Sequence, residues 1–230
     1  LLPDGTAYIV MDLLLGETLR TRMERCGTMS IVSAIRTTRQ IASAMSAAHR
    51  AGITHRDLKP ENVMLVIDPA MPDGERVKIL DFGIAKLSSR ENGPKTKTGM
   101  ILGTPHYMSP EQWLNSGGAT SASDVYSLAV MLYEMLTGRR PFDADTPFSI
   151  AAKVVSTEPP RLQGNGVQVP VGLSDFVAAM MRKDPARLQD EAAAISMFGG
   201  RRVVRVRDAG EGLSDLFASF LAAPVGDSLI

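Results

Sequence analysis

An apolar stretch near the middle of the chain, residues 124–136, limits the possible architectures more than any other segment. Apolar side chains occupy almost every face of a helix drawn over these residues, and Thr137-Gly138 supplies a stop. A helix of this kind is stable only when other elements surround it. The sequence therefore predicts a largely helical body built around one buried helix.

The other periodic segments predict what surrounds that helix. Residues 31–49 place apolar side chains at helical spacing and precede Gly52, which predicts an amphipathic helix. Residues 63–67 and 77–80 are short β-type runs joined by turn residues, which predicts a hairpin. A further strand is predicted over residues 7–11. Later helices, separated by prolines, are predicted near residues 148–155, 174–182 and 189–198.

Composition excludes several classes of partner and site. Lys plus Arg and Asp plus Glu number 25 each, so no global basic field favours nucleic acid or an anionic membrane. The single cysteine, Cys26, excludes an internal disulfide framework and a multi-cysteine zinc site, and it fits a reducing compartment. We expect Cys26 to be a small, half-buried apolar residue. The longest unbroken apolar run, residues 128–133, is far too short to span a bilayer.

Three polar motifs carry the chemistry. Residues 55–62 read His-Arg-Asp-Leu-Lys-Pro-Glu-Asn, and eight specified positions in a row have chance odds on the order of one in ten billion. Asp-Phe-Gly follows at residues 81–83, one hairpin further on, and Gly-Thr-Pro-His-Tyr-Met-Ser-Pro-Glu occupies residues 103–111. These motifs resemble the catalytic loop, the metal-binding tripeptide and the end of the activation segment of eukaryotic-type (Hanks-type) serine/threonine protein kinases. The residues of the second and third motifs are similar to those of bacterial members of the family.

The resemblance implies a role for each polar residue of the catalytic loop. Asp57 would accept or orient the proton of a substrate hydroxyl, and Lys59 would neutralise charge on the transferring phosphoryl group. Asn62 would offer its amide oxygen to Mg²⁺, which prefers oxygen ligands. His55 and Arg56 would have structural or regulatory roles in the same loop.

The tripeptide after the second strand would complete the metal site. Asp81 would bridge Mg²⁺ to the nucleotide phosphates, Phe82 would pack inside, and Gly83 would permit the turn. The alternative is a simple turn at the end of a strand, with Asp81 in solvent.

Four further residues match positions of the family outside the first two motifs. Thr104 would hydrogen-bond near the catalytic aspartate and lysine, which is similar to the pattern of kinases that act on Ser and Thr. Glu111 would form a buried pair with Arg187, although the spacing from Asp184 to Arg187 is one residue shorter than in the family. Asp124 would hold the catalytic loop by accepting backbone hydrogen bonds. Alternatively, Asp124 is an ordinary acidic residue in the first turn of a helix, where the helix dipole favours it.

Residues 8–14 resemble the strand and hinge that grip adenine. Met11 would be the gatekeeper, and the backbone of Asp12 and Leu14 would bond the edge of the base. Met64 would form the apolar floor under adenine. The alternative is that these are core residues of the kind that any fold requires.

A polar loop over residues 88–100 suggests regulation. A phosphate on Thr96 or Thr98 would pair with Arg56 and order the segment. The alternative is a solvated polar loop with no regulatory role.

Two elements that the kinase family places before the hinge are not found there. The only glycine before Leu13 is Gly5, and the first lysine of the chain is Lys59, so neither a glycine-rich loop nor a strand lysine precedes the hinge. We therefore expect an α+β, kinase-like large lobe without most of the small lobe. The expected division is a small-lobe remnant, the large lobe with its catalytic loop at 55–62 and activation segment at 81–111, and a tail or linker, at residues 1–12, 13–198 and 199–230.

The resulting hypothesis is a fragment of a serine/threonine protein kinase that transfers the γ-phosphate of ATP to protein hydroxyls with Mg²⁺. The expected partners are ATP and protein substrates, with no nucleic acid and no membrane segment in this chain, and the expected location is the cytoplasm or the cytosolic side of a membrane. The alternative is an inactive truncated kinase or a pseudokinase that binds or scaffolds. Because catalysis in this family is mostly positioning and charge stabilisation, we expect the 230-residue chain alone to bind Mg²⁺-ATP weakly and to show no appreciable activity.

Overall fold

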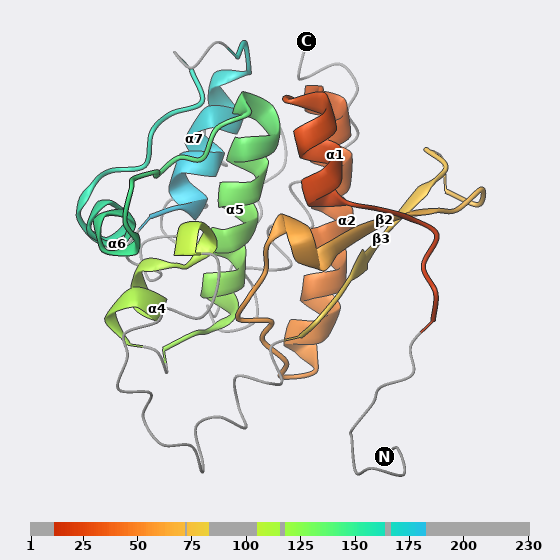
Figure 1. Ribbon diagram of the computed structural model, residues 1–230, viewed down its shortest axis with the longest axis horizontal. Coiled ribbons are helices and arrows are strands. Elements are labelled where there is room, and N and C mark those ends of the chain that lie inside the picture. Colours follow the sequence, from red (N-terminus) through yellow and green to blue (C-terminus); the bar gives the residue numbers. More distant parts are fainter. Residues whose placement is uncertain (1–11, 72, 83–104, 116–117, 164–166, 183–230) are drawn as a thin grey trace, which may run out of the picture.

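The computed structural model describes residues 12–71, 73–82, 105–115, 118–163 and 167–182. Within them lie a small sheet and a set of helices arranged around one central helix (Figure 1). The helices are α1 (Leu19–Cys26), α2 (Ile31–Arg50), α4 (Pro110–Leu114), α5 (Ser121–Thr137), α6 (Pro147–Ser156) and α7 (Val171–Met180). The strands are β1 (Gly16–Thr18), β2 (Val63–Ile67) and β3 (Glu75–Ile79), and short 3₁₀ turns cover Pro60–Asn62 and Pro105–Tyr107.

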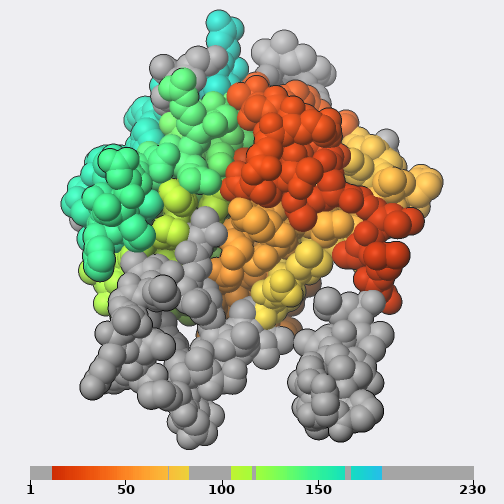
Figure 2. Space-filling model, in the orientation of Figure 1, coloured from red at the N-terminus to blue at the C-terminus, as the bar shows by residue number. Residues whose placement is uncertain are grey.

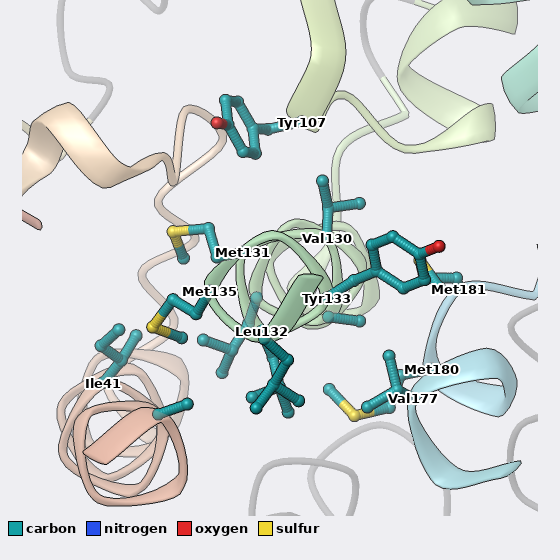
Figure 3. Close-up of a cluster of buried hydrophobic side chains, with 14 of the residues drawn as sticks. Ile41, Tyr107, Val130, Met131, Leu132, Tyr133, Met135, Val177, Met180 and Met181 are labelled. Carbon is teal, nitrogen blue, oxygen red and sulfur yellow. The ribbon is translucent and has the colours of Figure 1, made fainter. Parts of the chain in front are cut away.

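The central helix is α5, which confirms the prediction of a buried helix in the middle of the fold. It lies between α2 on one side and α7 on the other (Figure 1). Figure 3 shows Met135 pointing toward Ile41 of α2 and Met131 on the side nearer Tyr107, whereas Tyr133 lies toward Met181 at the end of α7. Since this helix is buried on both sides, its apolar side chains make it the core of the described residues.

The ends of α5 follow from local hydrogen bonding. Thr120 caps the first turn, and its backbone N–H donates to the hydroxyl of Ser123 at 3.1 Å. The last turn closes at Gly138, which has a left-handed φ of 68°. A residue with a side chain would be strained in that conformation, so glycine is the natural stop.

Helix α2 confirms the second helical prediction. Its first turn is capped by Ser30, whose hydroxyl accepts from the backbone N–H of Ser33 at 3.2 Å. The helix ends at Arg50 with Ala51 as its C-cap, and Gly52 turns the chain with a φ of 73° toward the catalytic-loop motif. The buried face of α2 packs on α5 and on β3.

The sheet is antiparallel in the order β1-β2-β3. It confirms the predicted hairpin, with β3 beginning two residues before the expected position. Gly16 of β1 crosses β2 so closely that a Cβ atom there would lie 2.0 Å from the carbonyl oxygen of Leu65. Only glycine allows this approach, and it brings the segment after residue 12 against the strand that leaves the catalytic loop.

Two features differ from the sequence-based expectations. Helix α1 was not predicted, because only Leu19 and Met23 of its eight residues are buried and the apolar signal is therefore weak. The prediction that Cys26 is half-buried was wrong, since Cys26 is exposed. It is the last residue of α1, and after the turn at Gly27 the buried position is taken by Met29.

Several predictions fall on other parts of the chain. The strand at 7–11, the loop at 88–100, the helix at 189–198 and the C-terminal tail lie outside the described residues. Among the helices that the structure describes, none combines the length and the apolar character that crossing a membrane requires.

Candidate active site

The motif at residues 55–62 forms a loop whose first residues are hydrogen-bonded to the first turn of α5. The carboxylate of Asp124 accepts the backbone N–H of His55 with one oxygen and the backbone N–H of Arg56 with the other, both at 2.9 Å. The Nε2 atom of His49, at the end of α2, lies 2.8 Å from the same carboxylate. Asp124 is only 2% exposed, so these bonds are formed away from water and fix the loop to the rigid centre of the fold.

Inside the loop, polar side chains form an ion pair and a hydrogen bond to the backbone. The Nζ atom of Lys59 lies 2.9 Å from a carboxylate oxygen of Asp57, and both side chains are partly exposed. The Nδ2 atom of Asn62 donates to the backbone carbonyl of Asp57 at 2.9 Å. This bond uses the nitrogen side of the Asn62 amide and leaves its oxygen as the atom that is available to a cation.

The second motif is brought next to the first by the hairpin. The backbone N–H of Leu80 donates to the carbonyl of Asn62 at 2.8 Å, directly beyond the last pair of the β2–β3 register, Val63 opposite Ile79. The Nε2 atom of His55 lies 2.9 Å from the carbonyl oxygen of Leu80. Asp81 follows immediately, so its exposed carboxylate comes from the strand end that pairs with Asn62.

The first two residues of the tripeptide are marked by a ring contact and by an unusual backbone conformation. The ring of Phe82 lies against the ring of His55, with 4.9 Å between the centroids. Asp81 has a positive φ of 51°, an uncommon conformation for a residue with a side chain. Unusual backbone of this kind is found mainly where the surroundings hold it in place for a functional purpose.

An amide oxygen and a carboxylate at neighbouring strand ends fit a hard cation such as Mg²⁺. Among the described residues, no group of three or more His, Cys, Asp or Glu side chains is placed to hold a metal ion. Mg²⁺ usually takes one or two protein ligands and completes its shell with water and phosphate oxygens.

The other predicted site residues come from segments before and after the catalytic loop. Asp12 is exposed and Leu14 is half-buried, in the segment that leads into β1. Met64 lies in β2, opposite Thr18 of β1 and Lys78 of β3. The side chain of Glu111 accepts from the hydroxyl of Ser123 at 2.5 Å. The remaining predicted residues lie outside the described part of the chain, and these are Met11, Gly83, Thr96, Thr98, Thr104 and Arg187.

Comparison with known proteins identifies the family. The protein kinase domain family matches residues 3–192, which is most of the chain. The chain belongs to the protein kinase domain family. The resemblance drawn from the three motifs is therefore confirmed, together with the α+β, kinase-like fold class.

Similar kinases are found in bacteria. The chain is 40% identical to the serine/threonine-protein kinase PknA of Mycobacterium tuberculosis over 181 residues, which cover 79% of this chain and 39% of PknA. It is 38% identical to PknL of the same organism over 188 residues, which cover 82% of this chain and 45% of PknL. It is 42% identical to pkn3 of Myxococcus xanthus over 159 residues, which cover 68% of this chain and 28% of pkn3. The chain thus spans less than half the length of these curated relatives.

A solved structure has the same fold. The crystal structure of Rad53 1–466 in complex with AMP-PNP matches with a TM-score of 0.60 at 25% sequence identity. The match covers 76% of this chain and 42% of that one.

This kinase-family chain also contains a partly buried ionic cluster that the sequence did not predict. Arg20 of α1 donates to Glu61 of the catalytic loop at 2.9 Å and to Glu134 of α5 at 3.1 Å. A further nitrogen of Arg20 contacts the hydroxyl of Tyr107, which donates to Glu134 at 2.5 Å. Burial raises the pKa of Tyr107, and the negative charge of Glu134 raises it further. The cluster therefore ties α1 to the catalytic loop and to the turn at Pro105–Tyr107.

No local sequence signal would have indicated this cluster. Its members are separated by 27 to 114 residues along the chain, and although Glu61 and Tyr107 lie in the recognised motifs, no motif includes Arg20 or Glu134. Figure 2 shows the outer surface of α1 in red, directly above the orange residues that follow α2. The contact is thus a product of tertiary packing.

Replacing Arg20 by methionine is expected to lower the free energy of unfolding by about 2 kcal/mol, because the buried carboxylate of Glu134 then loses its main cationic partner. Arg140, whose Nε atom lies 3.6 Å from Glu134, keeps part of the compensation. Denaturant unfolding followed by circular dichroism measures the difference. Arg25→Met is the matched control, since Arg25 lies on the same helix and pairs with Glu17 but its side chain is 60% exposed. The control should unfold almost as wild type does, because an exposed ion pair contributes little to stability, and equal losses in the two variants would contradict the prediction.

Proposed function

We propose that the protein to which this chain belongs transfers the γ-phosphoryl group of ATP to serine and threonine hydroxyls of other proteins. The observation that carries this proposal is the loop fixed by Asp124, which presents Asp57 beside Lys59 at 2.9 Å. Membership of the kinase family supports the use of ATP. The relatives PknA, PknL and pkn3 are named serine/threonine-protein kinases, which supports Ser and Thr as the acceptors.

In the proposed mechanism, the residues of this chain orient the substrate hydroxyl and neutralise the negative charge of the phosphates. Asp57 accepts or orients the proton of the substrate hydroxyl, and Lys59 faces the charge that develops on the transferring group. Asn62 and Asp81 would hold Mg²⁺, which when bound neutralises the phosphates of ATP. The order that Asn62 imposes on the loop, through its bond to the carbonyl of Asp57, supports this division of roles.

The remaining site assignments belong to the same proposal. Asp12 and Leu14 would bond the adenine edge through their backbone, with Met64 below the base and Met11 as gatekeeper. The strand β2, which contains Met64, pairs with β1 directly after the segment that holds Asp12 and Leu14, and this supports the arrangement. The proposal also keeps the expected division of the chain at residues 12 and 198, and the cytosolic location.

The experiment that tests the function is phosphoryl transfer by the purified full-length protein. With radiolabelled ATP, Mg²⁺ and a protein substrate, the label should appear on phosphoserine or phosphothreonine after acid hydrolysis. Removing Mg²⁺ with a chelator should abolish the transfer. Absence of any transfer, or label on tyrosine alone, would overturn the proposal and would favour the alternative of a binding or scaffolding protein.

Regulation by phosphorylation of Thr96 or Thr98 is a further part of the proposal. Arg56 supports it, because its Nε atom is buried and has no hydrogen-bond partner among the described residues. A phosphate oxygen is an acceptor to which the guanidinium of a half-buried arginine can donate.

A Thr96→Ala, Thr98→Ala double variant is expected to reduce activity about tenfold or more, because the activation segment then cannot be ordered by a phosphate. Phosphopeptide mapping of the active wild-type protein identifies the modified residue, and phosphoryl transfer measures the loss. A Ser88→Ala, Ser89→Ala double variant, in the same predicted loop, serves as the control. Full activity of the threonine variant, or an unmodified loop in the active protein, would contradict this regulation.

A further inference from the structure

Gln112 of α4 uses both ends of its side-chain amide to connect two parts of the site. Its Oε1 atom accepts from the backbone N–H of Ser109 at 3.0 Å and from the hydroxyl of Ser109 at 3.2 Å. Its Nε2 atom donates to the backbone carbonyl of Arg56 at 3.0 Å. The three bonds use the acceptor and the donor of one amide, so its orientation is determined.

The carbonyl that Gln112 holds belongs to a residue with unusual backbone geometry. Arg56 has a φ of 68°, in the left-handed region that long side chains rarely adopt. Such a conformation persists only where the surroundings determine it from more than one side. On the N-terminal side of Arg56, its N–H is held by Asp124, and on the C-terminal side its carbonyl is held by Gln112.

The Arg56 carbonyl is also half of the peptide group that leads into Asp57. The N–H of this same peptide group, on Asp57, faces the Nδ1 atom of His55 at 3.3 Å. Because a peptide group is planar, fixing its carbonyl also fixes the Cα atom of Asp57, from which the side chain starts. Gln112 therefore acts on the position of the residue whose carboxylate the proposed function places at the substrate hydroxyl.

The other end of Gln112 is anchored to the turn that precedes α4. Ser109 follows the 3₁₀ turn at Pro105–Tyr107, where the carbonyl of Tyr107 accepts from the hydroxyl of Ser127 on α5 at 2.7 Å. The turn and the catalytic loop are thus each attached to α5, through Ser127 and Asp124 respectively. Gln112 links the turn and the catalytic loop directly, through hydrogen bonds that do not involve α5.

We propose that Gln112 is a positioning residue for phosphoryl transfer, which sets Asp57 relative to the turn at Pro105–Tyr107. This inference rests on the proposed function, because it assigns to Asp57 the role at the substrate hydroxyl. A purely structural role is the competing explanation, since Gln112 together with Ser109 forms the capping box of α4. The two roles differ in chemistry, because the cap needs only an acceptor whereas the bond to Arg56 needs a donor.

Two substitutions separate these roles in the full-length protein. Gln112→Glu keeps an acceptor for Ser109, and a glutamate at this position of a capping box is favourable, but it cannot donate to the Arg56 carbonyl. Gln112→Leu removes both functions. We expect both variants to lower kcat on the order of tenfold or more, with KM for ATP within about twofold of wild type, because misplacing a reacting group by a small distance slows the chemical step. The thermal midpoint of Gln112→Glu should stay near that of wild type.

Gln40 offers a matched control. Its Oε1 atom accepts from the backbone N–H of Val77 at 2.9 Å, and its Nε2 atom donates to the carbonyl of Glu75 at 3.3 Å. It thus makes the same kinds of bond as Gln112, between α2 and β3 and away from the catalytic loop. Gln40→Leu should lower the thermal midpoint about as much as Gln112→Leu while leaving kcat within about twofold of wild type.

Failure of the Gln112 proposal can be distinguished from failure of the proposed function. If the wild-type protein transfers phosphate and Gln112→Glu retains kcat within about twofold, the positioning role is overturned and only the cap remains. If the wild-type protein transfers nothing, the proposed function fails, and amide exchange of a peptide covering residues 53–59 still tests whether Gln112 orders the loop. Faster exchange in Gln112→Glu than in Gln40→Leu supports the positioning of Asp57 by Gln112, and equal exchange overturns it.

Discussion

Replacing Asp57 by asparagine is expected to lower kcat for phosphoryl transfer by about 100-fold or more in the full-length protein, because positioned acid–base groups usually contribute at least that factor. Asparagine has nearly the same shape as aspartate, so the loop should keep its backbone. It carries no charge, however, and it cannot accept a proton from a substrate hydroxyl. Lys59 also loses the carboxylate that lies 2.9 Å from its Nζ atom. The expected variant is therefore folded and almost inactive.

Binding of Mg²⁺-ATP distinguishes this outcome from unfolding. The proposed ligands of the metal are Asn62 and Asp81, which the substitution leaves unchanged, so Kd for Mg²⁺-ATP by calorimetry should stay within about threefold of wild type. Asp73→Asn is the matched control, since Asp73 also pairs with a cation, Arg36, but on an exposed surface away from the loop. A variant of Asp57 that retains more than about a tenth of the wild-type kcat would contradict the proposed role.

The parts of the fold that were predicted are those with a local signal. Helix α2 was predicted from its apolar period and α5 from apolar side chains on almost every face. The strands β2 and β3 were predicted from short β-type runs, and each element was placed within a few residues. The catalytic loop was located because eight consecutive residues match one pattern. Position 124 was singled out in the same way, and the structure places its carboxylate on the backbone of His55 and Arg56.

The parts that were missed depend on contacts between distant segments. Helix α1 has too few apolar residues to show a helical period, and its position is determined by Arg20, which reaches Glu61 and Glu134 across the fold. Gln112 reads in the sequence as an ordinary polar residue of a helix, and its bond to Arg56 spans 56 positions. A sequence taken alone gives no measure of such distances, so interactions of this kind require the packed structure.

Replacing Asp124 by asparagine is expected to lower the free energy of unfolding by about 3 kcal/mol and to reduce kcat in the molecules that remain folded. The carboxylate serves two backbone N–H groups and lies 2.8 Å from the Nε2 atom of His49. An asparagine side chain has one oxygen, so its NH₂ group must face at least one of these groups inside a site that water does not reach. An unsatisfied buried polar group costs about 1–3 kcal/mol, and the charge-assisted character of the original bonds adds to the loss.

Denaturant unfolding of the purified protein measures the change in stability, and kinetics under fully folded conditions measure the change in kcat. Asp175→Asn is the matched control, because Asp175 pairs with Arg161 at 2.6 Å on the surface, where both side chains are exposed. A surface pair of this kind contributes at most about 1 kcal/mol, so the control should be nearly as stable as wild type. If Asp124→Asn costs no more than Asp175→Asn and leaves kcat unchanged, the buried carboxylate does not hold the loop. Asp124 would then be only an acidic residue favoured by the first turn of α5.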